Sequence, residues 1–173
     1  MFLLIAAAVV VADQVSKIWA ASTLPLGGPE VAIGLGFNLT YVRNTGAAFG
    51  ILPNSTLILG ILSAVVSLFL IVYLWRSGAQ MSRVQYAALT LILGGAVGNM
   101  IDRFRLGYVI DFIHFRLPNF NYPVFNLADS AVVIGAGLLI IASFGSDEQE
   151  HDEDAGEPFV SDARNKESAE STD

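Results

Sequence analysis

Two aspartates stand in apolar surroundings, where a carboxylate is costly to keep. Asp111 lies between Val109-Ile110 and Phe112-Ile113, and Asp129 follows Leu127-Ala128 at the start of a long apolar stretch. An ionisable side chain at membrane depth points to a function. Two carboxyls that share one task are typical of acid–base hydrolysis. We therefore interpret Asp111 and Asp129 as a candidate catalytic pair.

The chemistry of such a pair follows from its electrostatics. Two nearby carboxyls in a medium of low dielectric constant cannot both ionise cheaply, so they share one proton and titrate as a unit. The ionised member can take a proton from water, while the protonated member donates a hydrogen bond to the scissile carbonyl. We expect Asp129 to be the anion, because a helix start favours negative charge, and Asp111 to carry the proton.

Further polar residues form clusters whose members are three or four positions apart, so each cluster lies on one helical face. The clusters are Asp13 with Lys17; Asn99 with Asp102 and Arg103; and Asn126 with Asp129 and Ser130. With four membrane crossings, all three clusters lie near the same membrane face, together with Arg43-Asn44. This convergence predicts one polar site.

Each cluster also has a structural explanation. Asp13 and Lys17 could be an ion pair near the interface, because intramembrane charges usually pair. Asn126 could cap a helix, with Asp129 in its first turn where the dipole prefers an anion. Asp111 has no comparable explanation.

Other residues have alternatives of the same kind. The Asn99, Asp102 and Arg103 group could be a helix-end network that holds the bundle. His114, three residues after Asp111, could be its partner, although an interfacial histidine more often has no part in chemistry. Closely spaced glycines usually allow helix backbones to approach, and we interpret three of them in this way: Gly94, Gly95 and Gly98.

The composition is that of an integral membrane protein. Of 173 residues, 54% are hydrophobic and 14% charged, and the mean hydropathy is +0.59. Residues 1–144 carry a net charge of +2, whereas residues 145–173 carry −9. The absence of cysteine excludes a disulfide framework, a thiol nucleophile and a Cys-ligated metal.

About 20 apolar residues are needed to cross a membrane, and four segments qualify. They are residues 1–21, 55–75, 84–101 and 126–144. A signal peptide is the alternative for the first segment, but it has no basic start, and Asp13 and Lys17 interrupt it. We expect residues 1–144 to form one four-span domain and residues 145–173 an acidic, disordered cytoplasmic tail.

The connections between the spans differ in character. The short link Ser77–Arg83 follows Arg76 and holds no acid, which favours a cytoplasmic position. Thr23–Asn54 and Asp102–Phe125 are long and share the other side. Apolar residues alternate from Val31 to Val42, which predicts a strand within a β cradle at about residues 30–50. Strand edges cannot face lipid, so we place this sheet at the membrane surface.

Five short motifs occur in order along the chain. They are Asp13-Gln14-x-x-Lys17, Asn44-Thr45-Gly46-Ala47-Ala48-Phe49, Gly98-Asn99-x-x-Asp102-Arg103, Val109-x-Asp111-Phe112 and Phe125-Asn126-x-Ala128-Asp129. Each is unspecific alone, but together, on four expected spans, they closely resemble the bacterial lipoprotein signal peptidase family (signal peptidase II). The resemblance covers roughly residues 10–145.

The resemblance implies an inner-membrane aspartyl endopeptidase that removes the signal peptide from diacylglyceryl-modified prolipoproteins, cutting just before the lipidated cysteine. By motif match, Asp111 and Asp129 are the catalytic pair. The positions that shape or support the site are Asp13, Lys17, Asn44, Asn99, Asp102, Arg103 and Asn126. The resemblance also implies cytoplasmic termini, an active site near the extracytoplasmic face and inhibition by the cyclic peptide globomycin. We expect no cofactor, metal or nucleic acid, contact with membrane phospholipids, and a monomer.

Two other classes of function stay open. Intramembrane carboxylates also form proton or ion relays, but a relay needs ionisable groups distributed across the bilayer, and here they gather near one face. A non-enzymatic lipid-binding factor could use the same sheet without needing both aspartates. An intramembrane serine protease is disfavoured, because His114 is the only histidine outside the tail.

Overall fold

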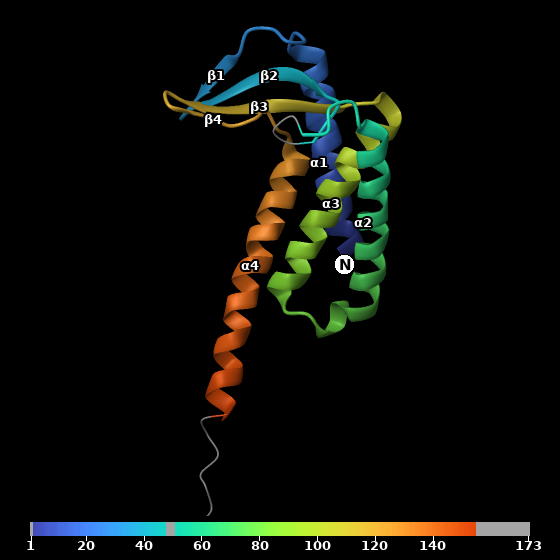
Figure 1. Cartoon of the computed structure of the whole chain (residues 1–173), viewed down its shortest axis with the longest axis vertical. Helices are drawn as coiled ribbons and strands as arrows, with labels where there is room; N and C mark the ends of the chain where they lie inside the picture. Colours follow the sequence, from blue (N-terminus) through green and yellow to red (C-terminus); the bar gives the residue numbers. More distant parts are fainter. Residues whose placement is uncertain (1, 48–50, 155–173) are drawn as a thin grey trace, which may run out of the picture.

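Four long helices form a bundle that is capped at one end by a small sheet (Figure 1). The computed structural model describes residues 2–47 and 51–154. The helices are α1 (Phe2–Thr23), α2 (Thr56–Ser77), α3 (Arg83–Leu106) and α4 (Leu127–Asp154). All four are long and apolar enough to cross a membrane, so the prediction of four spans is confirmed for the described residues.

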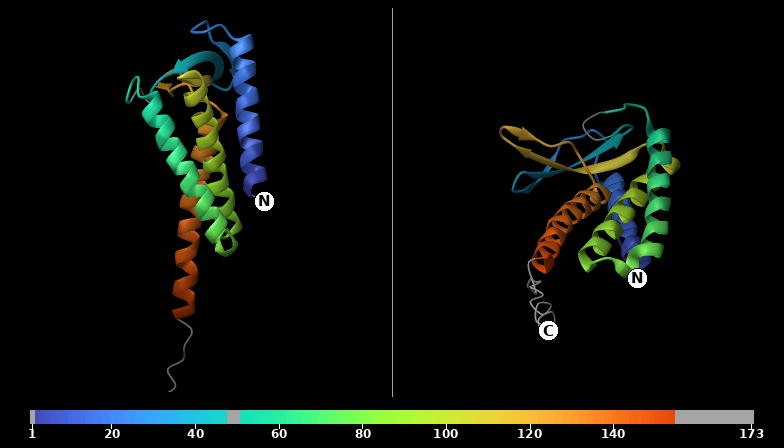
Figure 2. Two further views of the ribbon diagram at one scale, coloured as in Figure 1. Left: turned by 90° about the vertical axis from the view of Figure 1, so that its right-hand side faces the viewer. Right: turned by 60° about the horizontal axis from the view of Figure 1, so that its bottom comes forward.

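Helix α3 is the centre of the bundle. It packs against α1, α2 and α4, and Figure 2 shows it between α1 and α2. Its glycines allow this close approach, as the sequence predicted. A Cβ atom on Gly94 would meet Val9 of α1, and one on Gly95 would lie 2.3 Å from the carbonyl oxygen of Ala128 in α4. Gly98 leaves room for the carboxyl of Asp13.

The ends of α3 follow from local sequence. Ser82 and Gln85 form a reciprocal capping box, in which each side chain accepts a hydrogen bond from the backbone N–H of the other residue. At the other end, Gly107 takes a left-handed conformation with φ of 79° and donates its N–H to the carbonyl of Arg103. This sharp end turns the chain directly into the sheet that carries Asp111.

The sheet has four antiparallel strands in the order β1-β2-β3-β4. They are β1 (Val31–Gly34), β2 (Phe37–Asn44), β3 (Val109–Leu117) and β4 (Phe120–Asn121). The expected cradle is therefore present in the first long connection, although residues 48–50 of that segment lie outside the described residues. Half of the sheet, however, comes from the second long connection.

The sheet differs from the expectation in two respects. The alternating run from Val31 to Val42 is not one strand but a hairpin, because Leu35 and Gly36 both have positive φ values, 54° and 84°, and form its turn. Strand β3 was not expected at all. Its residues Val109–Phe112 are all buried, so polar and apolar side chains do not alternate there. The period of two that predicts a half-buried strand is therefore absent.

Helix α4 continues past its expected end at residue 144 to Asp154. The helix therefore includes residues 145–154, and the acidic tail from residue 145 stays a prediction. No proline interrupts the segment from Leu127 to Asp154, and an existing helix propagates easily through Glu and Gln. Figure 1 shows this helix extending beyond the others at the end away from the sheet. The rest of the expected tail, residues 155–173, lies outside the described residues.

Substitution of Gly95 by alanine tests the contact between α3 and α4. The new Cβ would meet the backbone oxygen of Ala128, which cannot rotate away, so we expect a loss of about 1–3 kcal/mol in stability. Thermal unfolding in detergent micelles measures the effect. Gly137→Ala in α4 is the matched control, because nothing lies within 4 Å of its Cβ position and stability should not fall. Equal losses in both variants would contradict this close contact.

Candidate active site

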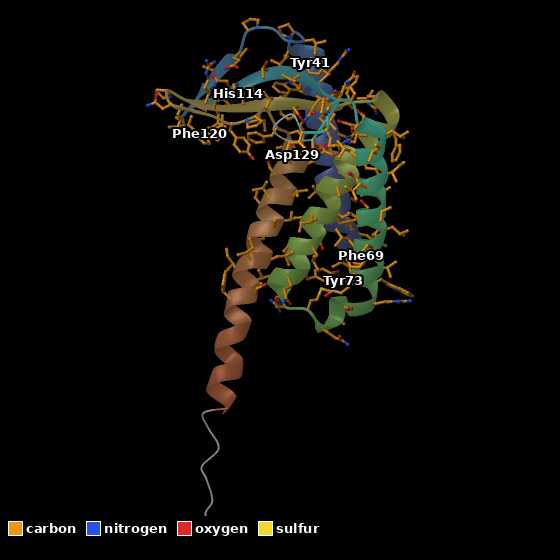
Figure 3. All side chains as sticks on the ribbon, in the orientation of Figure 1. Tyr41, Phe69, Tyr73, His114, Phe120 and Asp129 are labelled. Carbon is orange, nitrogen blue, oxygen red and sulfur yellow. The ribbon has the colours of Figure 1, made fainter. Side chains whose placement is uncertain are left out.

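Asp111 and Asp129 are brought together where the sheet meets the bundle. Asp111 lies in β3 opposite Val42 of β2, and only 2% of it is exposed. Asp129 lies in the first turn of α4, beneath the sheet (Figure 3). A strand from the second long connection and the helix that follows it therefore supply the two carboxyls.

Asn126, directly before α4, contacts both carboxyls. Its side-chain Nδ2 donates to Asp111 Oδ1 at 2.7 Å, and its backbone N–H donates to Asp129 Oδ2 at 3.2 Å. The backbone N–H of Asp129 donates in return to Asn126 Oδ1 at 2.9 Å. The predicted helix cap is thus confirmed as a capping box. These residues can therefore cap the helix and take part in a catalytic site at the same time.

The remaining carboxyl oxygens also accept hydrogen bonds from amides. Asn44 Nδ2 of β2 donates to Asp111 Oδ2 at 3.0 Å. Asn99 Nδ2 of α3 donates to Asp129 Oδ1 at 2.7 Å. Each of the four oxygens therefore has one neutral donor. Among the side chains of residues 2–47 and 51–144, neither carboxyl forms an ion pair.

Burial decides the protonation of Asp111. The pKa of its carboxyl is raised to about 7, chiefly by desolvation and then by the negative charge of Asp129, against the lowering effect of the hydrogen bonds from Asn44 and Asn126. Asp111 can therefore hold a proton close to neutral pH. This supports, on independent grounds, its expected role as the proton carrier.

A buried cation lies beside this pair. The ammonium of Lys17 lies 2.9 Å from Asp13 Oδ2, 3.0 Å from Asp102 Oδ2 and 2.9 Å from Asn99 Oδ1. Lys17 and the two carboxylates are each at most 1% exposed. An ammonium has three N–H donors, so all of them are used. The Asp13–Lys17 ion pair expected from the sequence is present, and it extends to α3.

The carboxylates around Lys17 hold the backbone next to the catalytic candidates. Asp13 Oδ1 accepts the N–H of Ala128 at 2.9 Å, and Asp102 Oδ2 accepts the N–H of Ile110 at 3.0 Å. Ala128 and Ile110 immediately precede Asp129 and Asp111 in sequence. Each supporting carboxylate thus fixes the position of one member of the pair.

Lys17 also sets the direction of the amide of Asn99. Asn99 Oδ1 accepts hydrogen bonds from Lys17 and from Asn126 Nδ2, the latter at 3.1 Å. The Nδ2 group of Asn99 must therefore face Asp129. Because Asn99 can only donate to this carboxyl, the arrangement stabilises the ionised form of Asp129.

The structure separates Arg103 from the other members of its expected cluster. Asn99 and Asp102 join Lys17, whereas Arg103 Nη2 lies 3.5 Å from the carbonyl oxygen of Gly46. The guanidinium interacts favourably with the charges of Asp129 and Asp111. Its buried Nε has no hydrogen-bond partner among the described residues. Arg103 thus adds positive potential near the pair without direct contact.

Sequence reasoning left one supporting residue unassigned. Gln14 Nε2 donates to Asp102 Oδ1 at 3.0 Å and lies 3.2 Å from Asp13 Oδ2. It also lies 3.2 Å from the carbonyl oxygen of Gly98. Gln14 belongs to the first motif, but its spacing to Asp13 does not place the two on one helical face, so helical periodicity gave no signal.

An open, mainly apolar pocket of about 720 Å³ ends at Asp129, between the lower face of the sheet and α4. It is lined by Ile33, Phe37, Leu39, Phe112, Ile113, Phe115, Tyr122, Phe125, Asp129, Ser130, Val133 and Ile134. The pocket can hold an apolar chain with one end at the carboxyl pair. Its lining was not predicted, because β3 was not.

Comparison with known proteins identifies the family of the chain. The family model for signal peptidase (SPase) II matches residues 5–145. The chain belongs to the signal peptidase II family. The prediction made from the five motifs is confirmed.

Relatives and a solved structure agree with this assignment. The lipoprotein signal peptidase of Halothermothrix orenii is 44% identical over 133 residues, which are 77% of this chain and 88% of that protein. The lipoprotein signal peptidase of Caldanaerobacter subterraneus is 48% identical over 139 residues, 80% of this chain and 92% of that protein. A bacterial membrane enzyme solved by the in meso method is 36% identical, with a TM-score of 0.77 over 86% of this chain and 90% of that one.

Substitution of Lys17 by methionine tests the buried cation. The change leaves Asp13 and Asp102 buried without their counter-charge, so we expect stability to fall by about 3–5 kcal/mol. Thermal unfolding in micelles provides the measurement. Arg105→Met removes an exposed cation from α3 and serves as the control, with a change of at most about 0.5 kcal/mol. A Lys17 variant as stable as the Arg105 variant would show that the cation does not hold the site.

Proposed function

We propose that this signal peptidase II family member removes the signal peptide from diacylglyceryl-modified prolipoproteins, cutting before the lipidated cysteine. The observation that carries the proposal is the bridge made by Asn126 between Asp111 and Asp129 at the end of an apolar pocket. Two carboxyls provide the acid and the base of an aspartic peptidase. The pocket provides a place for the apolar part of the substrate.

In the proposed mechanism, water is the nucleophile. The carboxylate of Asp129 takes a proton from water as the oxygen attacks the carbonyl carbon, and the proton of Asp111 hydrogen-bonds to the carbonyl oxygen and stabilises the developing negative charge. The tetrahedral intermediate then collapses, and the leaving amine takes the proton from Asp129. No covalent enzyme intermediate is needed.

The neighbouring residues keep the two carboxyls in these states. The capping box and Asn99 give Asp129 two donors that favour its ionised form. Burial favours the protonated form of Asp111. Asp13, Lys17 and Asp102 hold the backbone of both residues. Asn44 of the first long connection donates to Asp111, and Arg103 of α3 donates to the carbonyl oxygen of Gly46 in the same connection.

We place the protein in the bacterial cytoplasmic membrane as a monomer with both termini cytoplasmic. The short link between α2 and α3, flanked by Arg76 and Arg83, is then cytoplasmic, as the distribution of basic residues favours. The sheet caps the opposite end of the bundle (Figure 1), so the active site faces the extracytoplasmic leaflet. Exposed apolar side chains along all four helices fit contact with phospholipids.

The single substitutions Asp111→Asn and Asp129→Asn test the catalytic pair. Each keeps the shape of the side chain but removes the acid or the base, so we expect cleavage of a lipidated precursor in micelles to fall at least about 1,000-fold. The double variant should lose little more, because the pair works as one unit. Asp162→Asn is the matched control and should cleave normally. A folded single variant that cleaves at the normal rate would refute the pair.

The pH dependence of cleavage tests the protonation of Asp111. Because this carboxyl acts in its neutral form, kcat should fall as the pH rises through about 7. Asn44→Ala removes a donor that stabilises the ionised form, so the pKa of Asp111 should rise and this fall should move upwards by about 0.5–1 pH unit. The exposed Asn119→Ala should leave it in place. A downward shift in the Asn44 variant would contradict the assignment.

A further inference from the structure

His114 connects two edges of the sheet across its outer face. It lies in β3 and is only 7% exposed. Its Nδ1 is 2.6 Å from Glu30 Oε1, and its Nε2 is 2.5 Å from Asn121 Oδ1. Glu30 directly precedes β1, and Asn121 lies in β4, on the opposite edge of the sheet. Figure 3 shows His114 within the sheet, well to the side of the helix bundle.

The charged groups around His114 are few. Glu30 lies in the segment before β1, and Arg116 lies in β3. Arg116 Nη1 is 3.7 Å from Glu30 Oε2. Strands β1 and β4 contain no charged residue, and Asn38 is the residue of β2 opposite His114. Asp111 is three positions away, on the other face of β3. Glu30 is therefore the charge that contacts the imidazole.

The residues held by His114 lead directly into the pocket that ends at Asp129. After β4 the chain continues to Tyr122 and Phe125, which line this pocket. The N–H and C=O of Phe125 both pair with Ile113, the neighbour of His114. On the other edge, Glu30 leads into β1, whose Ile33 also lines the pocket. Both sides of the pocket roof are thus anchored to one imidazole.

We propose that His114 is a positioning residue that clamps the roof of the substrate pocket, and that protonation of His114 tightens the clamp. An imidazolium donates from both nitrogens, whereas a neutral imidazole donates from only one. Both nitrogens face oxygen atoms here, and the bond to the Glu30 carboxylate becomes charge-assisted in the protonated form. The clamp is therefore strongest when both ring nitrogens carry a proton.

The consequence for substrate rests on the proposed function. A tightened roof binds the apolar part of the substrate better, so KM should be lowest at acid pH and rise about threefold between pH 5.5 and 8. In His114→Gln, which cannot take a charge, this rise should be lost, while kcat and its fall near neutral pH stay as in the wild type. At each pH, the KM of the wild type is divided by the KM of His114→Gln. Both proteins contain the Asp111–Asp129 pair, so the effect of its titration cancels in this ratio.

A double-mutant cycle identifies the partner. Glu30→Gln should remove the rise in KM as His114→Gln does, and the combined variant should add little to either change. Asn119→Ala, in the turn between β3 and β4, is the control and should keep the rise. A KM ratio that does not vary with pH, or fully additive effects, would overturn the clamp.

Amide hydrogen exchange tests the clamp without any substrate. At each pH, the exchange rate of the amides of residues 120–125 in the wild type is divided by the rate in His114→Gln. This ratio should be about three- to tenfold lower at pH 5.5 than at pH 8. Equal exchange in the two proteins at both pH values would refute the clamp even if cleavage is normal. If the precursor is not cleaved at all, the proposed function fails and the exchange experiment still decides the role of His114.

Discussion

The ammonium of Lys17 is the interaction on which the arrangement of the site depends. Its three acceptors come from α1 and α3, and through them it reaches the backbone of α4 and of β3. A cation without water is stable only when all its donors are used, so the two helices cannot shift relative to each other without leaving a charge unpaired. The position of both catalytic candidates is therefore fixed from the interior of the bundle rather than from the connections that surround it.

Much of the helix bundle and of the candidate site could be predicted, because membrane-spanning segments have a simple sequence pattern. Long apolar segments give the helices, and any polar residue inside them must have a partner, so Asp13, Lys17, Asn99 and Asp102 identify the site by their presence alone. The identity of their partners could not be predicted. Helical spacing placed Asp102 beside Arg103, whereas in the structure Asp102 binds Lys17 of another helix. Contacts between helices depend on their rotation, which periodicity within one helix does not specify.

The sheet was only half predictable for a related reason. Strand β2 has one face towards the pocket and alternates in sequence, but β3 is buried on both faces between β2, α1 and α3, and alternation is lost there. The pocket was missed with it, since Phe112, Ile113 and Phe115 of β3 form much of its wall. The hairpin turn at Leu35 was missed because a leucine with positive φ is an unusual turn residue.

One consequence of the capping box concerns mutational robustness. The single side chain of Asn126 caps α4, donates to Asp111 and donates to Asn99. Aspartate could cap the helix but has no N–H group to donate, and serine or threonine is too short to reach several partners at once. Ala128 beside it is fully buried against the glycines of α3. Substitutions between Asn126 and Asp129 should therefore be tolerated less well than substitutions on the exposed faces of the helices.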